Sequence, residues 1–476
     1  MTWLLLLLAA APNIEQLDAQ EALNDTLEDR FNALCKELKA SGGQASKQYV
    51  DPPSLVAPQE LRWVKTCSFR ALSLSGPAGT KKARVLWELD GLTTSGERLT
   101  ERGEANATLT SRKTGWAITA FEHDVHQLVR RPAARFTEVA RDVGLVFPNE
   151  RTGHLLLGGL AVRDVNGDGR LDVVATNGTE VVLFTQGDGL RFTPTQVSAG
   201  HPRMWTSSVT AADFDDDGDA DLVVTHHPGL VEVFKNEKGV LSSAGAVAHD
   251  GQWQSAIAAD FDQDGHLDLA LLPYPLESAP TNPLEATNGF PLELWRGDGK
   301  LGFSRWHEET KFPKRWTLSA VAADLLAQGR PQLYVANDYG SNDLWRFEAD
   351  GGLSNVATTA GVVDPGNGMS ADVADFDGDG RSDLYVANMF SKAGTRVLSN
   401  TKGLPPALLG AVQKFARGNT LYLANDDGGF REVALSQGVN RGLWAFGSVM
   451  TDVDLDGRLD VAVANGYLSH PNRKDS

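Results

Sequence analysis

Short acidic clusters are the part of this sequence best suited to chemistry. Five nine-residue stretches share the pattern D-x-[D/N]-x-D-G-x-x-D, and they begin at Asp164, Asp213, Asp260, Asp375 and Asp452. Each places side-chain oxygens at positions 1, 3, 5 and 9 and glycine at position 6. Carboxylates this close repel one another unless a cation lies between them. The pattern therefore indicates a metal site rather than a solvated turn.

Oxygen ligands in a flexible loop favour Ca²⁺, which takes about six to eight of them. An EF-hand would need glutamate at position 12 and flanking helices, but position 12 is apolar in all five stretches and both flanks resemble strands. We predict hairpin turns closed by about five Ca²⁺ ions. The predicted ligands are Asp164, Asn166, Asp168, Asp172, Asp213, Asp215, Asp217, Asp221, Asp260, Asp262, Asp264, Asp268, Asp375, Asp377, Asp379, Asp383, Asp452, Asp454, Asp456 and Asp460.

These loops belong to a longer repeat. A sixth copy, DLLAQGRPQ from Asp324, keeps the frame without most of the acids, which makes a sixth ion doubtful. Every copy has Gly or Ser five residues before its leading Asp, a short β-branched run after it and, in all but the last, a second hairpin. A period of about 50 residues with four strands is typical of a propeller blade. We predict a mainly β fold with a six-bladed β-propeller, with seven blades as the alternative.

The two ends of the repeat region are complementary. The last copy ends with the single strand LDVAVAN, and residues 126–140 align with the hairpin that begins at Asn419. We predict that 126–140 completes the last blade and closes the ring, which would remove exposed strand edges. The extra length at 389–418 is interpreted as an insertion that contains a helix, although it could hold a seventh blade.

A smaller α+β domain is predicted before the propeller. Residues 13–40 carry apolar side chains at helical spacing, from Ile14 to Leu38, and 60–125 alternate apolar and polar residues between Gly-containing turns. The predicted organisation is a signal peptide at 1–12, the α+β domain at 13–125 and the propeller at 126–476.

Composition limits the setting and the partners. The apolar run at the N-terminus is typical of a secretory leader and is too short to span a bilayer. We therefore expect an exported protein that is periplasmic, on the cell surface or extracellular, without a membrane span. A net charge of -18 argues against a nucleic-acid partner. Cys35 and Cys67 could form one disulfide or remain free.

The repeats resemble the FG-GAP/VCBS family of calcium-loop β-propellers, which is similar to the integrin α-subunit head. Phe446-Gly447 followed by DVDLDGRLD carries this likeness, and NMFSKAGTR, ARGNTLY and RGLWAFGS look more like bacterial exported members of the cartilage-acidic-protein-like group. The resemblance implies calcium ligation at the loop positions but no activity. The N-terminal helix and sheet are similar to the nuclear-transport-factor-2-like (SnoaL-like) cone, which in some proteins holds a ligand pocket.

The predicted function is a binding scaffold for a protein or carbohydrate partner, with no enzymatic activity. The segments 273–292 and 389–418 are the expected contact surfaces. Tryptophans just before the loops could grip a partner or, more simply, wedge the blades together: Trp205, Trp253, Trp316 and Trp444. A polysaccharide-active enzyme is the alternative, with Glu308 and Glu309 as the tempting carboxylate pair. A purely structural surface protein is a third possibility.

Overall fold

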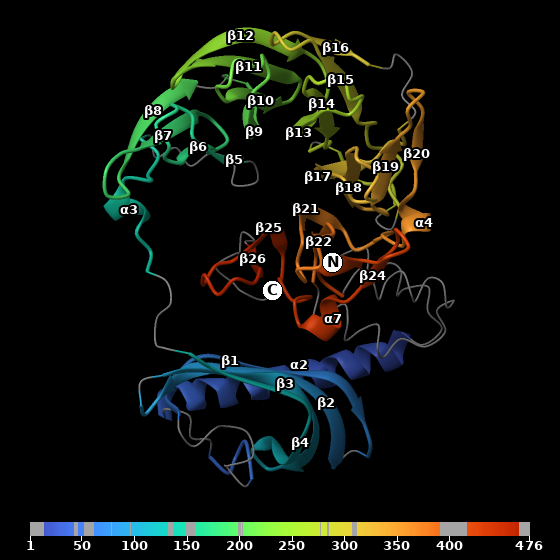
Figure 1. Cartoon of the computed structure of the whole chain (residues 1–476). Helices are drawn as coiled ribbons and strands as arrows, with labels where there is room; N and C mark the ends of the chain where they lie inside the picture. The colour runs from blue at the N-terminus through green and yellow to red at the C-terminus, as the bar shows by residue number, and fades with distance from the viewer. Residues whose placement is uncertain are drawn as a thin grey trace. The chain divides into compact units, whose positions relative to one another are not determined.

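The computed structural model describes most of the chain and divides it into two compact units (Figure 1). The described residues are 14–41, 46–51, 61–77, 79–95, 97–131, 137–148, 158–198, 201, 203–276, 278–282, 285–306, 312–390 and 417–465. One unit holds the described residues up to 131 and a short stretch that ends at Glu138, and the other holds those from Val139 onward. The two units are described separately below.

The N-terminal unit is a helix packed against one antiparallel sheet. Helix α2 (Ile14–Ser41) precedes β1 (Leu61–Ser75), β2 (Thr80–Thr93), β3 (Arg98–Arg112) and β4 (Gly115–Arg131), and the strands lie in the order β1-β2-β3-β4. The predicted helical spacing is borne out, because Leu27, Phe31, Leu34 and Leu38 are all buried against the sheet. The alternating segments form the predicted strands.

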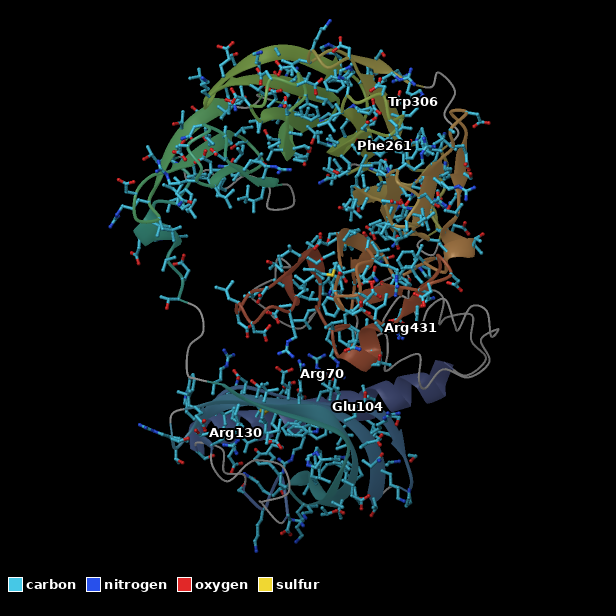
Figure 2. The ribbon with its side chains drawn as sticks, viewed as in Figure 1. Arg70, Glu104, Arg130, Phe261, Trp306 and Arg431 are labelled. Carbon is cyan, nitrogen blue, oxygen red and sulfur yellow. A yellow bond between two sulfur atoms is a disulfide. The ribbon has the colours of Figure 1, made fainter. Side chains whose placement is uncertain are left out.

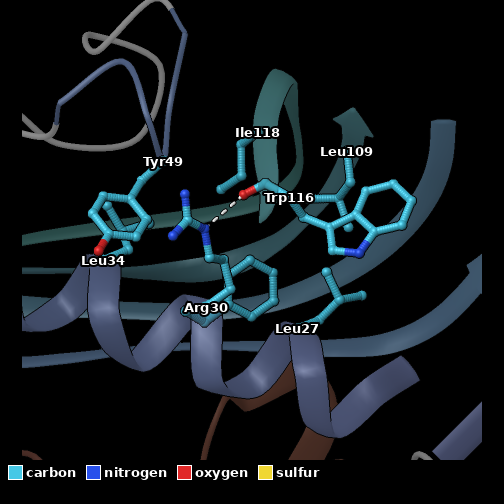
Figure 3. A pocket seen from close by; sticks show the side chains of 8 residues that line it. Leu27, Arg30, Leu34, Tyr49, Leu109, Trp116 and Ile118 are labelled. Carbon is cyan, nitrogen blue, oxygen red and sulfur yellow. Dashed lines mark hydrogen bonds between the residues drawn. The ribbon is translucent and has the colours of Figure 1, made fainter. Parts of the chain in front are cut away.

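A disulfide joins the helix to the sheet. Cys35 of α2 and Cys67 of β1 are bonded, with their Cα atoms 5.4 Å apart. Nearby, a small hollow between α2 and the sheet is crossed by Arg30 (Figure 3), whose Nε donates to the carbonyl of Trp116 at 3.0 Å. The Arg30 guanidinium also lies 4.1 Å from the centre of the Tyr49 ring. Arg30 thus lines the hollow and connects the helix to the sheet.

The second unit consists of six antiparallel sheets in chain order, called here the first to the sixth sheet. Among the described residues the first five have four strands each and the sixth has two. The strands are β5 (Leu160–Arg163), β6 (Asp172–Thr176), β7 (Val181–Gln186), β8 (Phe192–Ser198); β9 (Trp205–Ala212), β10 (Asp221–His227), β11 (Leu230–Glu237), β12 (Val240–Ala248); β13 (Trp253–Ala259), β14 (Asp268–Pro273), β15 (Glu293–Gly297), β16 (Phe303–Arg305); β17 (Trp316–Ala323), β18 (Gln332–Asp338), β19 (Asp343–Phe347), β20 (Leu353–Asn355); β21 (Gly368–Ala374), β22 (Asp383–Asn388), β23 (Thr420–Ala424), β24 (Phe430–Glu432); β25 (Ala445–Thr451) and β26 (Asp460–Asn465). This mainly β architecture agrees with the predicted propeller built from repeats.

The small residues before each loop lie where the first strands of neighbouring sheets converge. A Cβ added to Gly159 would lie 2.7 Å from the Cα of Ser208. Further along, the hydroxyls of Ser370 and Ser448 are 3.0 Å apart. A larger side chain at these positions would push adjacent sheets apart, which explains the Gly/Ser pattern of the sequence.

In the second and third acidic loops, the phenylalanine at position 2 packs against the following sheet. Phe214 packs edge-to-face on Phe303 of the third sheet, with ring centres 5.7 Å apart. Phe261, labelled in Figure 2, stacks at 4.7 Å on Phe347 of the fourth sheet. Trp306, also labelled there, stacks on the same ring at 6.0 Å. These apolar contacts join neighbouring sheets.

The predicted closing strand is partly wrong. Residues His126–Arg131 continue β4, where they pair with β3 up to Arg98↔Arg131, and do not add a strand to the sixth sheet. The physical reason is that β3 offers β4 a long antiparallel ladder that satisfies this backbone. The N-terminal sheet therefore extends beyond residue 125, and the sixth sheet has only β25 and β26 among the described residues.

Residues 137–148, which follow in the chain, resemble the segment that connects one sheet to the next. The short helix α4 (Ala357–Ala360) follows the fourth sheet, and a Cβ on its capping Gly361 would lie 3.2 Å from the carbonyl oxygen of Phe430 in the fifth sheet. Helix α3 (Ala140–Val143) ends at Gly144, which approaches the carbonyl oxygen of Phe192 in the first sheet in the same way. A third short helix, α7 (Ala434–Gln437), follows the fifth sheet. Helix α3 therefore precedes the first sheet in the same way that α4, which follows the fourth sheet, precedes the fifth.

Ring closure leads to a stability prediction. Leu160 is 67% exposed although Val209, at the same repeat position, is 5% exposed and packs on the preceding sheet. If the sixth sheet packs on the first, Leu160→Asp would bury an uncompensated charge and lower the melting temperature by about 5 °C. Leu435→Asp, which changes a leucine that is 61% exposed on α7, is the control and should melt like the wild type. Equal melting of both variants in a calorimeter would contradict closure at this face.

Candidate metal centre

All six loops share one backbone conformation. Each connects the first two strands of its sheet, and its position 6 is a glycine in the left-handed region, from φ +73° at Gly329 to +95° at Gly265. Position 4 is also left-handed, even where it is not glycine: Asp216, Gln263, Ala327 and Leu455. The φ of +73° to +95° at position 6 lies beyond the +52° to +63° of the non-glycine residues at position 4, so the turn favours glycine at position 6 for a steric reason.

The carboxylate at position 1 caps the turn. In the third loop Asp260 accepts hydrogen bonds from the backbone N–H of Asp264 and of Gly265, both at 3.1 Å. In the fourth loop Asp324 accepts the equivalent bonds from Gln328 and Gly329, at 2.8 and 2.7 Å. Such Asx-type bonds hold the loop without any contribution from the other acids.

The carboxylate at position 9 is buried in the first, second, third and fifth loops, where it ties the loop to its sheet. Asp268 is fully buried and accepts from the N–H of Phe261 at position 2 and from Gly297 on the third strand, both at 3.0 Å. Asp221 makes the same two bonds in the second sheet, to Phe214 and Asn236. Burial raises the pKa of each of these two carboxyls to about 6. A nearby cation would oppose that shift.

Positions 1, 3 and 9 converge in four loops. In each group the ligand-type oxygens lie within 4.8 Å of one another. The groups are Asp213, Asp215, Asp221; Asp260, Asp262, Asp268; Asp375, Asp377, Asp383; and Asp452, Asp454, Asp460. In the second loop, Oδ1 of Asp215 is buried and accepts no hydrogen bond from the described residues. An all-oxygen donor set with a spare buried carboxylate oxygen fits a hard divalent cation such as Ca²⁺.

The predicted ligand at position 5 lies outside these groups. Its carboxylate accepts the N–H of position 7, as in Asp264 with His266 at 2.9 Å. In four loops it also pairs with a basic side chain: Arg170 with Asp168, Lys235 with Asp217, Arg381 with Asp379, and Arg458 with Asp456. In the second, third, fifth and sixth loops the structure thus brings together three of the four predicted side chains, and in three of these loops a basic group pairs with the remaining one.

The first loop differs from the other four. Its position 3 is Asn166, which donates from Nδ2 to Asp168 at 3.0 Å and accepts the N–H of the same residue. Asp172 keeps its two backbone bonds, to Val165 and Gln186. Asp164 and Asp172 therefore supply only two carboxylates, which predicts a weaker site than in the other loops.

The fourth loop serves as an internal control for the role of the acids. It has the same turn with Leu326, Gln328 and Gln332 at positions 3, 5 and 9. Gln332 is fully buried and accepts the N–H of Leu326 at 2.9 Å. Because the turn forms without carboxylates at these positions, their presence in the other loops needs a different reason, and cation binding supplies one.

The other sequence predictions have mixed outcomes. Trp253 and Trp316 are each 3% exposed at the starts of β13 and β17, so these two wedge between sheets as in the simpler interpretation. The segment 273–292 packs on the fourth sheet, through a bridge between Phe290 and Arg315 and a bond from the N–H of Ala286 to the Tyr339 carbonyl at 2.7 Å. Residues 1–12, most of 389–418, and the pair Glu308 and Glu309 lie outside the described residues.

The sequence analysis missed one group of ligand-type side chains. His201, His226 and Glu232 place their ligand atoms within 4.8 Å of one another. The available signal was His226 itself, since its position in the repeat carries asparagine in four other copies: Asn177, Asn337, Asn388 and Asn465.

Comparison with known proteins agrees with the repeat assignment. The model of the FG-GAP-like repeat matches residues 164–224, 214–271 and 324–386. The predicted FG-GAP-like repeats are therefore confirmed over these residues. No curated protein matches the sequence. In the described part of the chain, no helix combines the length and apolar character needed to cross a bilayer.

Among solved structures, a lectin of Agrocybe aegerita that recognises non-reducing terminal N-acetylglucosamine is similar at 16% identity and a TM-score of 0.40. The match covers 75% of this chain and 81% of the lectin chain. The Tc holotoxin pore of Photorhabdus luminescens is similar at 14% identity and a TM-score of 0.28, over 66% of this chain and 16% of that chain. Likenesses this distant say nothing about the ligand of the present protein.

The basic partner of the second loop leads to a binding prediction. The Lys235 ammonium lies 2.7 Å from Asp215 and 3.2 Å from Asp217, and these hydrogen bonds raise the lysine pKa. A metal ion bound there would compete with this charge, so Lys235→Ala should tighten calcium binding at one site by roughly tenfold. Lys314→Ala, at an exposed position, is the control. Unchanged or weaker calcium affinity for Lys235→Ala in calorimetric titration would show that the ammonium does not compete.

Proposed function

We propose that this protein is an exported, calcium-binding β-propeller that acts as a binding scaffold for a protein or carbohydrate partner. The observation that carries the proposal is the recurrence of one three-carboxylate group in the same turn of the second, third, fifth and sixth sheets. A repeated site of this kind stabilises an architecture, whereas a catalytic site is normally unique within a chain.

Calcium would act on the turns and, through them, on the contacts between sheets. Positions 1, 3 and 9 would hold the ion, and it would supply the positive charge that their mutual repulsion requires. The same position 9 carboxylate holds the backbone of the residue at position 2, as Asp268 holds Phe261. Because Phe261 packs on the next sheet, binding at the turn would also order the junction between sheets.

A scaffold role is preferred to polysaccharide cleavage. Hydrolysis of a glycosidic bond needs two carboxyls free to exchange protons and to attack or activate water. The convergent aspartates are committed to backbone bonds, and a bound metal would keep them ionised. We therefore propose that the protein has no enzymatic activity. Its partner would be held by surfaces that the rigid sheets present.

Export is proposed on two features. The apolar leader predicted at residues 1–12 is typical of secretion. The Cys35–Cys67 disulfide joins the helix and sheet of the N-terminal unit, and such bonds persist mainly in oxidising compartments. Extracellular and periplasmic settings therefore suit the protein better than a reducing cytosol.

Calcium loading should raise thermal stability. Each ion that binds only the folded chain adds about 2.7 kcal/mol at a free concentration of roughly one hundred times Kd. We expect wild-type protein to melt at higher temperature in calcium than after chelation. Asp377→Asn should reduce the bound calcium by about one ion per chain in equilibrium dialysis, because it weakens one group of three. Asp426→Asn is the control, since that side chain is 94% exposed and pairs only with Arg381 among the described residues.

Melting curves that are identical with and without chelator would remove the calcium part of the proposal. An equal loss of calcium in Asp377→Asn and Asp426→Asn would instead show that binding reflects the diffuse negative charge of the surface.

Partner binding can be tested with the full chain loaded with calcium. We expect retention of a protein or a glycan on an array or in a pull-down, with loss on chelation because the sheets that present the surface loosen. Incubation with the retained glycan should release no new reducing ends. Release of reducing ends by the wild type, surviving Asp377→Asn, would favour the enzymatic alternative.

A further inference from the structure

Two histidines and a glutamate form a compact group in the second sheet. Nε2 of His226 lies 2.9 Å from Oε2 of Glu232, and Nε2 of His201 lies 3.2 Å from the same oxygen. The two imidazole rings meet edge-to-face with centres 4.8 Å apart. His226 is fully buried, while His201 remains 34% exposed, so the group opens to solvent on one side.

The group is separate from the calcium loops. Asp221 and His226 belong to the same strand, β10, but the first lies at the acidic turn and the second near the opposite end. Five residues of extended strand span about 17 Å. An ion held by the histidines would therefore share no ligand with one held by the turn.

The fourth sheet shows the role of the His226 repeat position where it only supports the fold. In the fourth sheet Asn337 accepts from the hydroxyl of Thr317 at 2.9 Å and donates to Asp343 at 3.0 Å. In the second sheet Thr206, His226 and Glu232 occupy the same strand positions, as the pairings Thr206↔His226 and Val224↔Glu232 show. The corresponding pairings in the fourth sheet are Thr317↔Asn337 and Val335↔Asp343.

The second repeat thus keeps the strand positions of this network and changes the residue types that occupy them. The amide is replaced by an imidazole, the aspartate by the longer Glu232, and His201 is added from the segment before β9. A hydrogen-bond network for the hairpin needs none of these changes, because the fourth sheet achieves it with Asn and Asp. What the changes add is a pair of imidazole nitrogens and a carboxylate oxygen that lie within 4.8 Å of one another.

We propose that His201, His226 and Glu232 bind a zinc-type divalent transition-metal ion. Two ring nitrogens and one carboxylate oxygen are ligands that Zn²⁺ favours, at about 2.0–2.2 Å each, and around a tetrahedral ion such ligands lie roughly 3.3 Å apart. The separations of 2.9 and 3.2 Å need to widen by only a few tenths of an ångström. Three protein ligands leave a fourth position for water or a partner group.

The surroundings of the group suit ligation. The hydroxyl of Thr206 lies 3.3 Å from Nδ1 of His226, so it can accept a hydrogen bond from Nδ1–H in the tautomer whose Nε2 carries the lone pair for the ion. Calcium, which prefers oxygen ligands, would compete poorly at this mixed set.

The test uses the full chain in a buffer with excess calcium, so that the acidic turns are saturated. We expect about one Zn²⁺ per chain in equilibrium dialysis with metal analysis, and a visible spectrum of tetrahedral type when Co²⁺ replaces it. His226→Asn restores the residue of the other repeats, which protects the fold, and should weaken zinc binding on the order of 100-fold or more. His249→Asn changes an exposed histidine that follows β12 and is the matched control.

The outcomes separate a metal site from a structural network. Loss of zinc in His226→Asn, Glu232→Gln and His201→Ala, with calcium stoichiometry unchanged, supports the proposal. Zinc binding by His226→Asn equal to that of the wild type would overturn it. If one variant fails to fold, the exposed His201→Ala still gives a reading, because its melting temperature without zinc should match the wild type while the zinc-induced rise disappears.

Discussion

The double hydrogen bond of the buried carboxylate at position 9 is the interaction on which the repeat region depends. One oxygen of Asp383 accepts the N–H of Phe376 in the loop, and the other accepts the N–H of Ala424 on the third strand, both at 2.8 Å. A single side chain thereby joins the turn, the strand that leaves it and the neighbouring third strand of the sheet. Because a buried carboxylate without partners is costly, removing either set of bonds would loosen the whole blade.

Charge is the main cost of this arrangement. Several carboxylates converge in each turn, and burial already disfavours the ionised form of Asp221 and Asp268. The chain offsets part of that cost with its own cations, such as Arg296 at 2.5 Å from Asp262 and Lys235 at 2.7 Å from Asp215. These basic side chains and a bound Ca²⁺ would both reduce the repulsion between the carboxylates. Calcium occupancy therefore depends on how strongly the ion competes with the basic side chains.

The repeat frame tolerates changes of chemistry because backbone groups hold it. The loop at Asp324 keeps its shape after losing the acids at positions 3, 5 and 9, since the bonds to Gln328 and Gly329 remain. At the other end of the blade, the frame around Thr317 and Asn337 recurs with Thr206 and His226. A fold supported in this way can lose an ion site in one repeat and gain another in the next without a change in topology.

The sequence alone determined the periodic features of this protein. The Gly at position 6 and the Gly/Ser before each loop are local requirements of one turn and one crowded strand, so they recur in every copy, and the Asp spacing recurs in five of the six. Only the tertiary structure decided features that depend on partners far along the chain. Residues 126–131 resembled a blade strand but found a longer ladder on β3, and the position 5 carboxylates turned to basic groups such as Lys235. Cys35 reached Cys67, and His201 reached Glu232, because folding placed them together, and spacing in a sequence carries no record of such contacts.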